Sequence, residues 1–229
     1  MAASAPHGSP TLLLVPTDLE RAGLADLGGF DPGLAIEAAC GFGPVAAAAR
    51  ASALLAELRP ARVLLVGIAG SYDLEANPVG SAARFDAVAI EGIGAGEGGE
   101  LRPPSALGFP QLPARPGEAA VFERIELARS RAGTPSCALL LSTCSVAASP
   151  VEADARRRRH PDAAAEDMEG FGVALACRLF GTPVCIVRGI SNAAGDRDPA
   201  RWRIPAGLAS ARELALAILR SGEPWTAAS

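Results

Sequence analysis

Short apolar runs alternate along this chain with longer helix-like segments, and this alternation constrains the fold more than any other feature of the sequence. Runs typical of buried strands lie at 11–15, 34–40, 63–66, 85–90, 137–142 and 184–187. Segments typical of helices lie at 45–58, 122–131, 150–159 and 208–219, and segment 163–180 is either a helix or a strand end that passes into one. Strands that alternate with helices predict an α/β fold with a mostly parallel sheet.

No shift of composition marks a second domain. At 229 residues the chain is long enough for one substantial core. We therefore expect a single domain over residues 11–220, with 1–10 and 221–229 as terminal segments.

The charged residues exclude several classes of function. The net charge is −4, which argues against nucleic acid or an anionic membrane as the main partner. The run Arg156–Arg159 is therefore interpreted as a solvated helix end, and His160 beside it as a surface residue. All 21 basic residues are arginines, so Schiff-base lysine and P-loop chemistry are excluded. Segment 1–10 lacks the plan of a signal peptide and no apolar run reaches membrane-spanning length, so we expect a cytoplasmic protein.

The five cysteines are scattered and include no CxxC pair, and the two histidines form no cluster with them. This pattern predicts reduced cysteines in the core rather than a disulfide framework or a zinc site. We expect no metal and no other cofactor.

Polar residues follow the last predicted strand. The sequence puts Arg188, Ser191 and Asn192 at and just beyond its carboxyl end, where open α/β sheets form their ligand crevices. Two glycine-rich turns, 41–43 and 67–71, follow other predicted strands and are either tight connections or anion sites. Because both follow strands of one sheet, they favour a shared crevice.

Three acidic residues, Glu166, Asp167 and Glu169, surround Met168 just before an apolar segment. A solvated helix start would explain them, since acids suit the positive end of the helix dipole. A carboxylate held beside apolar surface would instead grip two hydroxyls of a sugar. We favour this second interpretation for Glu169.

Together these segments resemble the nucleoside phosphorylase and nucleosidase family, in particular its methylthioadenosine/adenosylhomocysteine nucleosidase branch. Cys-Gly-Phe-Gly-Pro-Val-Ala-Ala-Ala at 40–48 resembles the branch's Gly-Ile-Gly-Lys-Val-Ala-Ala segment, and Gly-Ile-Ala-Gly at 67–70 its Gly-Ser-Ala-Gly turn. Asp-Met-Glu at 167–169 resembles its Glu-Met-Glu, and Arg-Gly-Ile-Ser-Asn at 188–192 its Arg-Ala-Ile-Ser-Asp. The resemblance implies a single-domain three-layer αβα sandwich around a mostly parallel or mixed sheet.

The resemblance also assigns roles to residues. Glu20 falls on the glutamate that activates water, Arg188 on the arginine that supports the water and the ribose side, and Asn192 on an aspartate that helps to protonate N7 of adenine. Glu169 falls on the glutamate that binds the ribose hydroxyls. The other substrate-binding residues that it implies are Ile68, Ala69, Gly70, Val146, Met168 and Ser191.

Three positions depart from the family pattern. Ile68 replaces a serine, Val146 replaces an aromatic residue that stacks on the base, and Asn192 replaces the aspartate. The last change is informative because Asn can donate an N–H to N7 or O6 of a 6-oxopurine, whereas an ionised Asp only accepts. Since buried groups left unpaired are penalised, Asn192 favours hypoxanthine or guanine over adenine.

The tail of the match resembles the futalosine hydrolase branch of the same family, through Arg-Asp at 197–198 and Trp-Arg-Ile at 202–204. That resemblance implies a nucleosidase of the futalosine route to menaquinone, which releases hypoxanthine and leaves dehypoxanthine futalosine. The far end of futalosine carries an aromatic carboxylate, for which the candidate cations are Arg84, Arg102, Arg201 and Arg203. The family forms homodimers or larger homo-oligomers, and we expect the same here.

Three other functions stay open on the sequence. A methylthioadenosine/adenosylhomocysteine nucleosidase would cleave adenine from its substrate. A 6-oxopurine nucleoside phosphorylase would use phosphate as nucleophile, although the carboxylate of Glu20 would repel it. A non-catalytic purine-nucleoside binding protein would keep the pocket without turnover, which the departures at Ile68 and Val146 allow. In every case the partner is a small-molecule nucleoside, not nucleic acid or a membrane.

Overall fold

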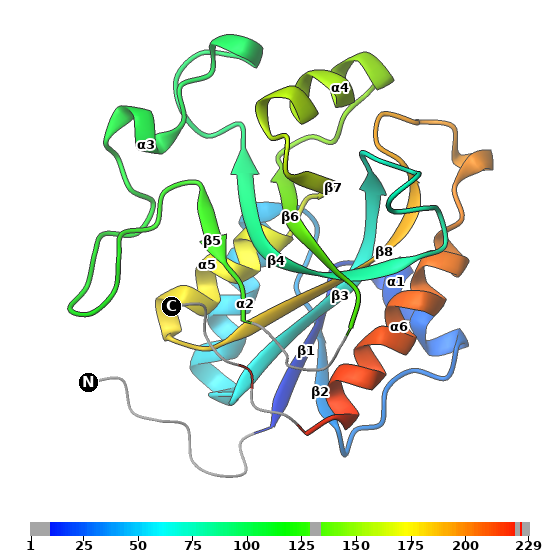
Figure 1. Cartoon of the computed structure of the whole chain (residues 1–229). Coiled ribbons are helices and arrows are strands. Elements are labelled where there is room, and N and C mark those ends of the chain that lie inside the picture. The colour runs from blue at the N-terminus through cyan, green and yellow to red at the C-terminus, as the bar shows by residue number, and fades with distance from the viewer. Residues whose placement is uncertain (1–9, 129–133, 223–224, 226–229) are drawn as a thin grey trace.

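A computed structural model of the chain describes residues 10–128, 134–222 and 225 (Figure 1). The strands are β1 (Thr11–Val15), β2 (Ala35–Ala39), β3 (Arg62–Ser71), β4 (Ala82–Glu91), β5 (Arg124–Glu126), β6 (Ser136–Thr143), β7 (Ala163–Asp167) and β8 (Val184–Ala193). The α-helices of the described part are α1 (Asp18–Asp26), α2 (Pro44–Leu58), α3 (Pro104–Leu107), α4 (Pro150–Arg159), α5 (Gly170–Phe180) and α6 (Ile204–Arg220), and 3-10 turns lie at Gly98–Glu100 and Pro199–Arg201. The expected alternation of strands and helices is confirmed.

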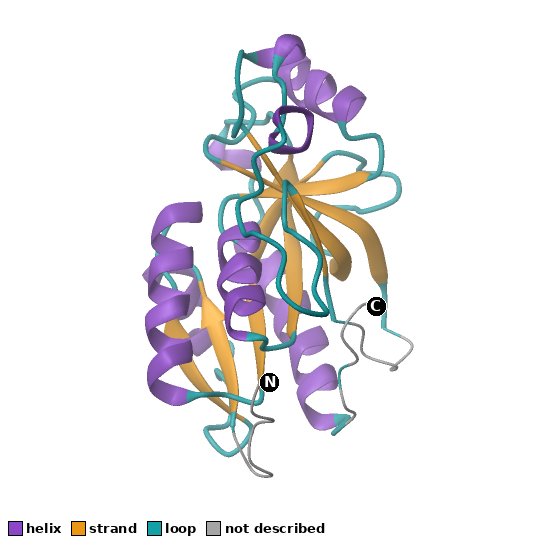
Figure 2. Cartoon of the chain, turned by 90° about the vertical axis from the view of Figure 1, so that its left-hand side faces the viewer, coloured by secondary structure: helices purple, strands orange, loops and turns teal. Residues whose placement is uncertain are grey.

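The strands form one mixed sheet that closes on itself. β2, β1, β3 and β8 lie side by side and parallel. β4 runs antiparallel to β8 and parallel to β6, while β5 adds a short antiparallel strand to β4. β6 is parallel to β7, and the end of β7 pairs antiparallel with the end of β3. The pairings β3–β8–β4–β6–β7–β3 therefore make a closed ring, and the strands fan out in the upper half of the molecule as viewed in Figure 2.

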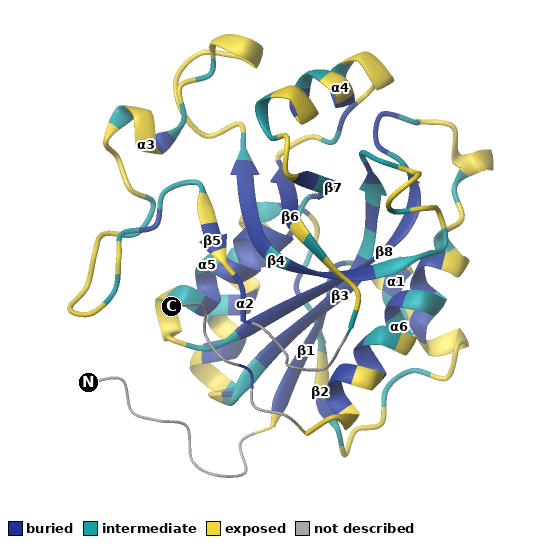
Figure 3. Ribbon diagram, viewed as in Figure 1, coloured by how far each residue is buried: buried dark blue, intermediate teal, exposed yellow. Residues whose placement is uncertain are grey.

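Helices cover the sheet on both faces, which confirms the predicted three-layer sandwich. α2 and α5 lie together on one face, and α1 and α6 lie on the other (Figure 1). Strand β1 shows how the core is divided, because Leu12 and Leu14 belong to the cluster under α2 and α5 while Leu13 belongs to the cluster under α6. A strand that is buried on both faces has a continuous apolar sequence, and the central strands are accordingly buried along their length (Figure 3).

Strands β3 and β8 extend beyond the apolar runs that predicted them. Residues 67–71, expected as a turn, are the second half of β3, and the polar residues expected at the end of the last strand lie within β8. Glycine marks close packing here rather than a break in the strand. A Cβ on Gly189 would lie 1.9 Å from the carbonyl oxygen of Gly207, so α6 can approach β8 only because that side chain is absent.

The predicted helix over residues 122–131 is wrong. Its described part contains β5, which pairs with β4, and residues 129–131 lie outside the described residues. Ile125 is buried between the exposed residues Arg124 and Glu126, which is the alternation of a strand. For segment 163–180 the second alternative is right, because β7 passes into α5.

The sheet joins strands from both ends of the described chain. It begins at Thr11 in β1 and ends at Ala193 in β8, and α6 packs back onto it. The domain limits of 11–220 stay a prediction. Within the described ranges, no helix is both long enough and apolar enough to cross a membrane.

Candidate active site

A cavity of about 430 Å³ opens where the carboxyl ends of β1, β3, β7 and β8 meet. Of the residues that the sequence assigned to the site, those that line it are Glu20, Ile68, Ala69, Gly70, Val146, Met168, Glu169, Ser191 and Asn192. Lining residues that the sequence left unassigned are Thr17, Leu19, Phe42, Glu166, Asp167, Arg197, Trp202 and Ile204. Arg188 lies behind the wall of the cavity. Segments far apart in the sequence therefore meet in one crevice, as their positions after strands predicted.

Glu20 is held firmly on the cavity wall. Helix α1 begins with a capping box in which the Thr17 hydroxyl accepts a hydrogen bond from the Glu20 N–H at 3.2 Å. Oε2 of Glu20 accepts from the main-chain N–H and the hydroxyl of Thr17, at 3.1 and 2.7 Å. Oε1 accepts from the N–H of Ile68 on β3 at 3.0 Å. The carboxylate is buried and fixed in one orientation by the start of its own helix.

Arg188 meets Glu20 beside the cavity. Its guanidinium is fully buried, its Nε donates to Asp167 at 3.1 Å, and its Nη2 lies 3.5 Å from the carboxylate of Glu169. Nη1 is buried without a hydrogen-bond partner among the described residues. A Cβ on Gly67 would lie 2.1 Å from that Nη1 and 2.6 Å from Oε1 of Glu20. Because Gly67 has no side chain, Nη1 of Arg188 and Oε1 of Glu20 can both lie close to it. The N–H groups of that Nη1 can then donate to a further acceptor.

Glu169 is a buried carboxylate at the N-cap of α5. Its Oε1 accepts a hydrogen bond from the N–H of Gly43, where α2 begins, at 3.0 Å. Burial raises the pKa of Glu169 to about 7, although the neighbouring Arg188 acts to lower it. The alternative of a solvated helix start is therefore wrong for this residue, which faces the cavity beside Met168.

The amide of Asn192 is oriented by its neighbour. Ser191 Oγ donates a hydrogen bond to Oδ1 of Asn192 at 2.7 Å, and Nδ2 donates to the carbonyl oxygen of Ala193 at 2.8 Å. An amide nitrogen carries two N–H donors. Because the oxygen is held by Ser191 and only one N–H is used, the other N–H of this cavity-lining side chain is available to a ligand.

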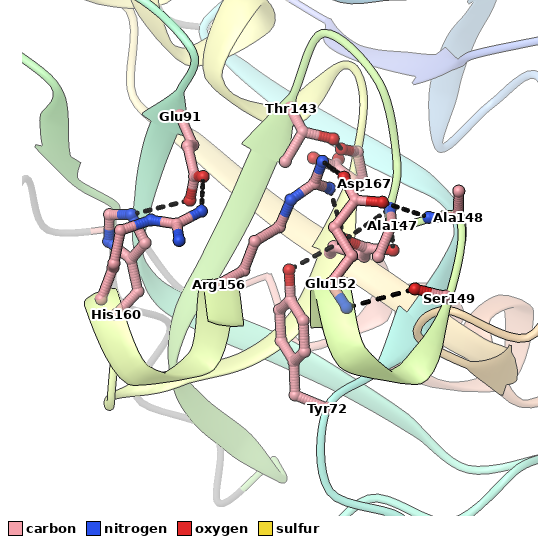
Figure 4. Close-up of polar contacts among 12 residues, drawn as sticks. Tyr72, Glu91, Thr143, Ala147, Ala148, Ser149, Glu152, Arg156, His160 and Asp167 are labelled. Carbon is pink, nitrogen blue, oxygen red and sulfur yellow. Dashed lines mark hydrogen bonds and ion pairs between the residues drawn. The ribbon is translucent and has the colours of Figure 1, made fainter. Parts of the chain in front are cut away.

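A buried carboxylate that the sequence left unassigned, Glu166, positions the wall around Val146. Oε1 of Glu166 accepts a hydrogen bond from the N–H of Ala147 at 3.0 Å. Oε2 accepts from the Tyr72 hydroxyl at 2.8 Å and from Nη1 of Arg156 at 3.1 Å. The three donors converge at this strand end (Figure 4). The sequence shows only that Glu166 directly precedes the Asp-Met-Glu motif, whereas the partners that its burial requires come from distant segments.

The arginine run of α4 is not simply a solvated helix end, which corrects the prediction. The pairs are Arg156 with Glu152 and Glu166, Arg157 with Asp73, and Arg159 and His160 with Glu91. Arg156 is buried, and His160, expected at the surface, is partly buried. The run therefore anchors α4 to β4, to β7 and to the segment that follows β3.

None of the arginines considered for the far end of the substrate lines the cavity. Arg84 pairs with Asp86, Arg201 pairs with Asp196, and Arg102 and Arg203 donate to main-chain carbonyl oxygens. Arg197 lines the cavity instead, and its guanidinium lies 5.0 Å from the centre of the Trp202 ring.

The described residues contain no group of three or more His, Cys, Asp and Glu side chains arranged to hold a metal ion. All the cysteines are free. Cys144 is exposed, so the prediction of core cysteines is wrong for this residue. Burial raises the pKa of Cys40 to about 12, so that this thiol, although near Arg188, stays protonated.

Comparisons with known proteins show the family to which the chain is similar. A family model described as the phosphorylase superfamily matches residues 34–221. A futalosine hydrolase of Streptomyces coelicolor is 37% identical over 163 residues, which are 71% of this chain and 67% of that protein. A futalosine hydrolase of Thermus thermophilus is 33% identical over 186 residues, 79% of this chain and 77% of that protein. The crystal structure of a methylthioadenosine/adenosylhomocysteine nucleosidase from Neisseria meningitidis superposes with a TM-score of 0.74 at 19% identity, covering 93% of this chain and 99% of that one.

The family model covers most of the chain, including β2 to β8, and the fold agrees with it. The relatives that match over most of their own length are nucleosidases. The chain therefore belongs to the phosphorylase superfamily.

Proposed function

We propose that this chain is a nucleosidase that hydrolyses the N-glycosidic bond of futalosine, with hypoxanthine and dehypoxanthine futalosine as products. The observation that carries the proposal is the hydrogen bond from Ser191 to Oδ1 of Asn192, which leaves an amide N–H to meet N7 or O6 of a 6-oxopurine. The relatives named as futalosine hydrolases support the same substrate. The reaction would be a step of the futalosine route to menaquinone.

The leaving base would be stabilised by Asn192. Cleavage of the C1′–N9 bond passes through an oxocarbenium-like state while negative charge arrives on the purine. A donor that is already oriented before the reaction stabilises that charge without reorganisation. Ser191 supplies this orientation for Asn192, and Glu166 fixes the main chain next to Val146, which would contact the face of the base.

The nucleophile would be a water molecule activated by Glu20. Glu20 is fixed by Thr17 and Ile68, so its remaining lone pair has a defined direction at the cavity wall. As general base it would take a proton from the water that attacks C1′. The unpaired Nη1 of Arg188 lies beside it and would donate a hydrogen bond to the same water.

The ribose would be bound by Glu169. One of its oxygens accepts from the N–H of Gly43, and the carboxylate faces the cavity next to Met168. An ionised carboxylate accepts hydrogen bonds from two adjacent hydroxyls. Bound in this way, the sugar would lie between the base contact at Asn192 and the general base Glu20.

Phosphorolysis by the same site is disfavoured by its charge. The carboxylates that line the cavity belong to Glu20, Glu166, Asp167 and Glu169, whereas the buried Arg188 is paired with Asp167. A phosphate ion near the nucleophile position would be repelled by carboxylates in a medium that screens poorly. Water carries no such penalty, so hydrolysis is the reaction that the charge distribution supports.

The proposal is tested with a nucleoside panel and chromatography of the released base. Futalosine, aminofutalosine, inosine and methylthioadenosine are each incubated with the protein, with and without phosphate and with and without a chelator. We expect hypoxanthine release from futalosine that needs neither phosphate nor a divalent metal. A sugar 1-phosphate product, loss of activity on chelation, or a preference for aminofutalosine would contradict it. Binding of futalosine without turnover would instead support a non-catalytic nucleoside-binding protein.

We also propose that the enzyme forms a homodimer or a larger homo-oligomer in the cytoplasm. Leu19, Phe42 and Val45 have exposed fractions of 62%, 68% and 81%, and the first two line the cavity. A second copy that covers these apolar side chains would also exclude water from the site. The free cysteines suit a reducing compartment. Light scattering coupled to size-exclusion chromatography measures the oligomeric state, and a monomer at micromolar concentration would contradict this proposal.

A further inference from the structure

The loop between β8 and α6 carries two long side chains into the cavity. Residues 194–203 leave the end of β8 and return to it, because the N–H of Arg203 donates to the carbonyl oxygen of Ser191 at 2.8 Å. Arg197 and Trp202 lie on this loop and line the cavity. The loop is therefore attached at both of its ends to the strand that carries Asn192.

Arg197 and Trp202 are oriented by one carbonyl oxygen. Nε1 of Trp202 and Nε of Arg197 both donate to the carbonyl oxygen of Asp196, each at 3.0 Å. The guanidinium lies over the indole ring, 5.0 Å from its centre, in the geometry of a cation–π contact. Among the hydrogen bonds of the described residues, Arg197 donates only through Nε, which leaves its two terminal nitrogens for a ligand.

The acidic residues of the loop are paired elsewhere. Asp196 lies 2.8 Å and Asp198 lies 3.5 Å from nitrogens of Arg201. No carboxylate of the described residues lies within ion-pair distance of Arg197, whereas the rest of the cavity wall carries carboxylates and no other arginine. The guanidinium of Arg197 is thus a planar cation without a paired carboxylate among the described residues, and it lies in a cavity whose other charged lining residues are acidic.

We infer that Arg197 and Trp202 form a subsite for a planar carboxylate attached, through an aromatic ring, to the 5′ side of the nucleoside. The inference rests on the proposed function, which assigns the base to Asn192 and the ribose to Glu169. The part of the wall that neither group would occupy includes Leu19, Phe42, Arg197, Trp202 and Ile204. A guanidinium fork binds a carboxylate through two parallel hydrogen bonds, and an indole ring stacks on an aromatic ring. The apolar residues would enclose the linker between the two.

The test compares pairs of substrates that share a base and differ in the 5′ group. The pairs are futalosine with inosine and aminofutalosine with methylthioadenosine. In each pair the first nucleoside carries the carboxylate and the second is neutral. The variants are Arg197→Gln, which keeps the length but removes the charge and the fork, and Arg203→Gln, a control on the same loop whose side chain bonds only to carbonyl oxygens. We expect Arg197→Gln to lower kcat/KM for the carboxylate partner by roughly tenfold to a hundredfold, the range of a charged hydrogen bond, mainly through KM.

The neutral partner of each pair should change by less than about twofold, and Arg203→Gln should leave both partners as in the wild type. An equal loss on both partners would mean that Arg197 only supports Trp202, and no loss on either would mean that it contacts no substrate; each result overturns the inference. A wild type that prefers the adenine pair refutes the futalosine assignment alone, because the carboxylate effect is still measured within that pair. Calorimetric binding of futalosine to wild type and Arg197→Gln gives the same comparison without turnover.

Discussion

Ser191 holds the oxygen of the Asn192 amide with a hydrogen bond of 2.7 Å, so the group that Asn192 offers to the cavity is a donor. Replacing Asn192 with Asp keeps the shape and the contact to Ser191 but turns this donor into an acceptor. We expect Asn192→Asp to lower kcat on futalosine by roughly 10²–10³, as for the loss of one preorganised donor. Activity on aminofutalosine should fall less or rise slightly.

The measurement is kcat/KM for both nucleosides on wild type and variant, with folding checked by circular dichroism. Ser191→Ala is the matched control, because it leaves Asn192 in place and lets the amide turn over. It should weaken the preference between the two bases without inverting it. An unchanged ratio in Asn192→Asp would show that this side chain does not distinguish position 6 of the purine.

Glu20→Gln should separate catalysis from folding. Glutamine at the third position of a helix satisfies a capping box as glutamate does, so α1 keeps its start. Its amide nitrogen cannot accept from the N–H of Ile68, so the free energy of unfolding should fall by about 1–3 kcal/mol while the protein still folds. Loss of the general base should lower kcat by roughly 10²–10⁴, while futalosine still binds. Glu57→Gln, an exposed position on α2, serves as the control and should behave as the wild type. Full turnover by Glu20→Gln would remove this residue from the mechanism.

The pH dependence should report Glu169. Its pKa is raised to about 7, and the ionised form is the one that accepts hydrogen bonds from ribose, so kcat/KM should rise as pH increases from 6 to 8. A single ionisation centred on 7 gives about a tenfold rise over that interval. Glu169→Gln should be less active and should lack this rise. If kcat/KM of Glu169→Gln rises with pH in the same way, the ionisation belongs to another group.

The same carboxyl group should affect stability in a defined direction. Its pKa in the folded protein, about 7, is above the ordinary value of 4.5, so the folded state binds a proton that the unfolded chain releases. The stabilisation due to protonated Glu169 is complete below pH 4.5 and is lost as pH rises through 7. Relative to the wild type, the melting temperature of Glu169→Gln should therefore increase between pH 5 and pH 8. A difference that stays constant over this range would contradict the raised pKa.

Gly67→Ala should damage both activity and stability. The new methyl group would overlap Nη1 of Arg188 and Oε1 of Glu20, at 2.1 and 2.6 Å. Overpacking of a buried position costs about 1–3 kcal/mol, and the two side chains would be pushed apart. Urea unfolding and kcat measure the two effects. Gly99→Ala is the control, because nothing lies within 4 Å of its added Cβ.

Much of the fold and of the candidate site could be predicted because both depend on short-range features. Arg188 to Asn192 follow an apolar run, so their place near the end of the last strand could be predicted from the pattern alone. For Asp167 to Glu169 the pattern left a helix and a strand end open. Strand β5 could not be predicted in this way. Its three residues are held by pairing with β4, a contact that no local pattern records.

The sequence does not show which arginine of the 194–203 loop pairs with the nearby acids and which stays available to a ligand. Several arginines lie between 196 and 204, and which of them is left for a ligand depends on which pairs with the nearby acids. In the structure Arg201 takes both Asp196 and Asp198. Similarly, the sequence alone predicts Arg156 in solvent, because its buried partner Glu166 lies 10 residues away along the chain and only folding brings α4 and β7 together.

In the proposed function, cleavage of the glycosidic bond and binding of the 5′ tail are carried by different parts of the molecule. Ile68, which holds Glu20, lies on β3, Asp167 on β7 and Asn192 on β8, so the groups to which we assign bond cleavage are held by a ring of paired strands. The 194–203 loop is attached to that ring at its two ends and carries Arg197 and Trp202, to which we assign the 5′ tail of the nucleoside. Exchange of this loop between relatives would therefore alter which nucleoside tails are accepted while the chemistry at the glycosidic bond is inherited intact, so that new substrates can arise within the family by changing a single surface connection.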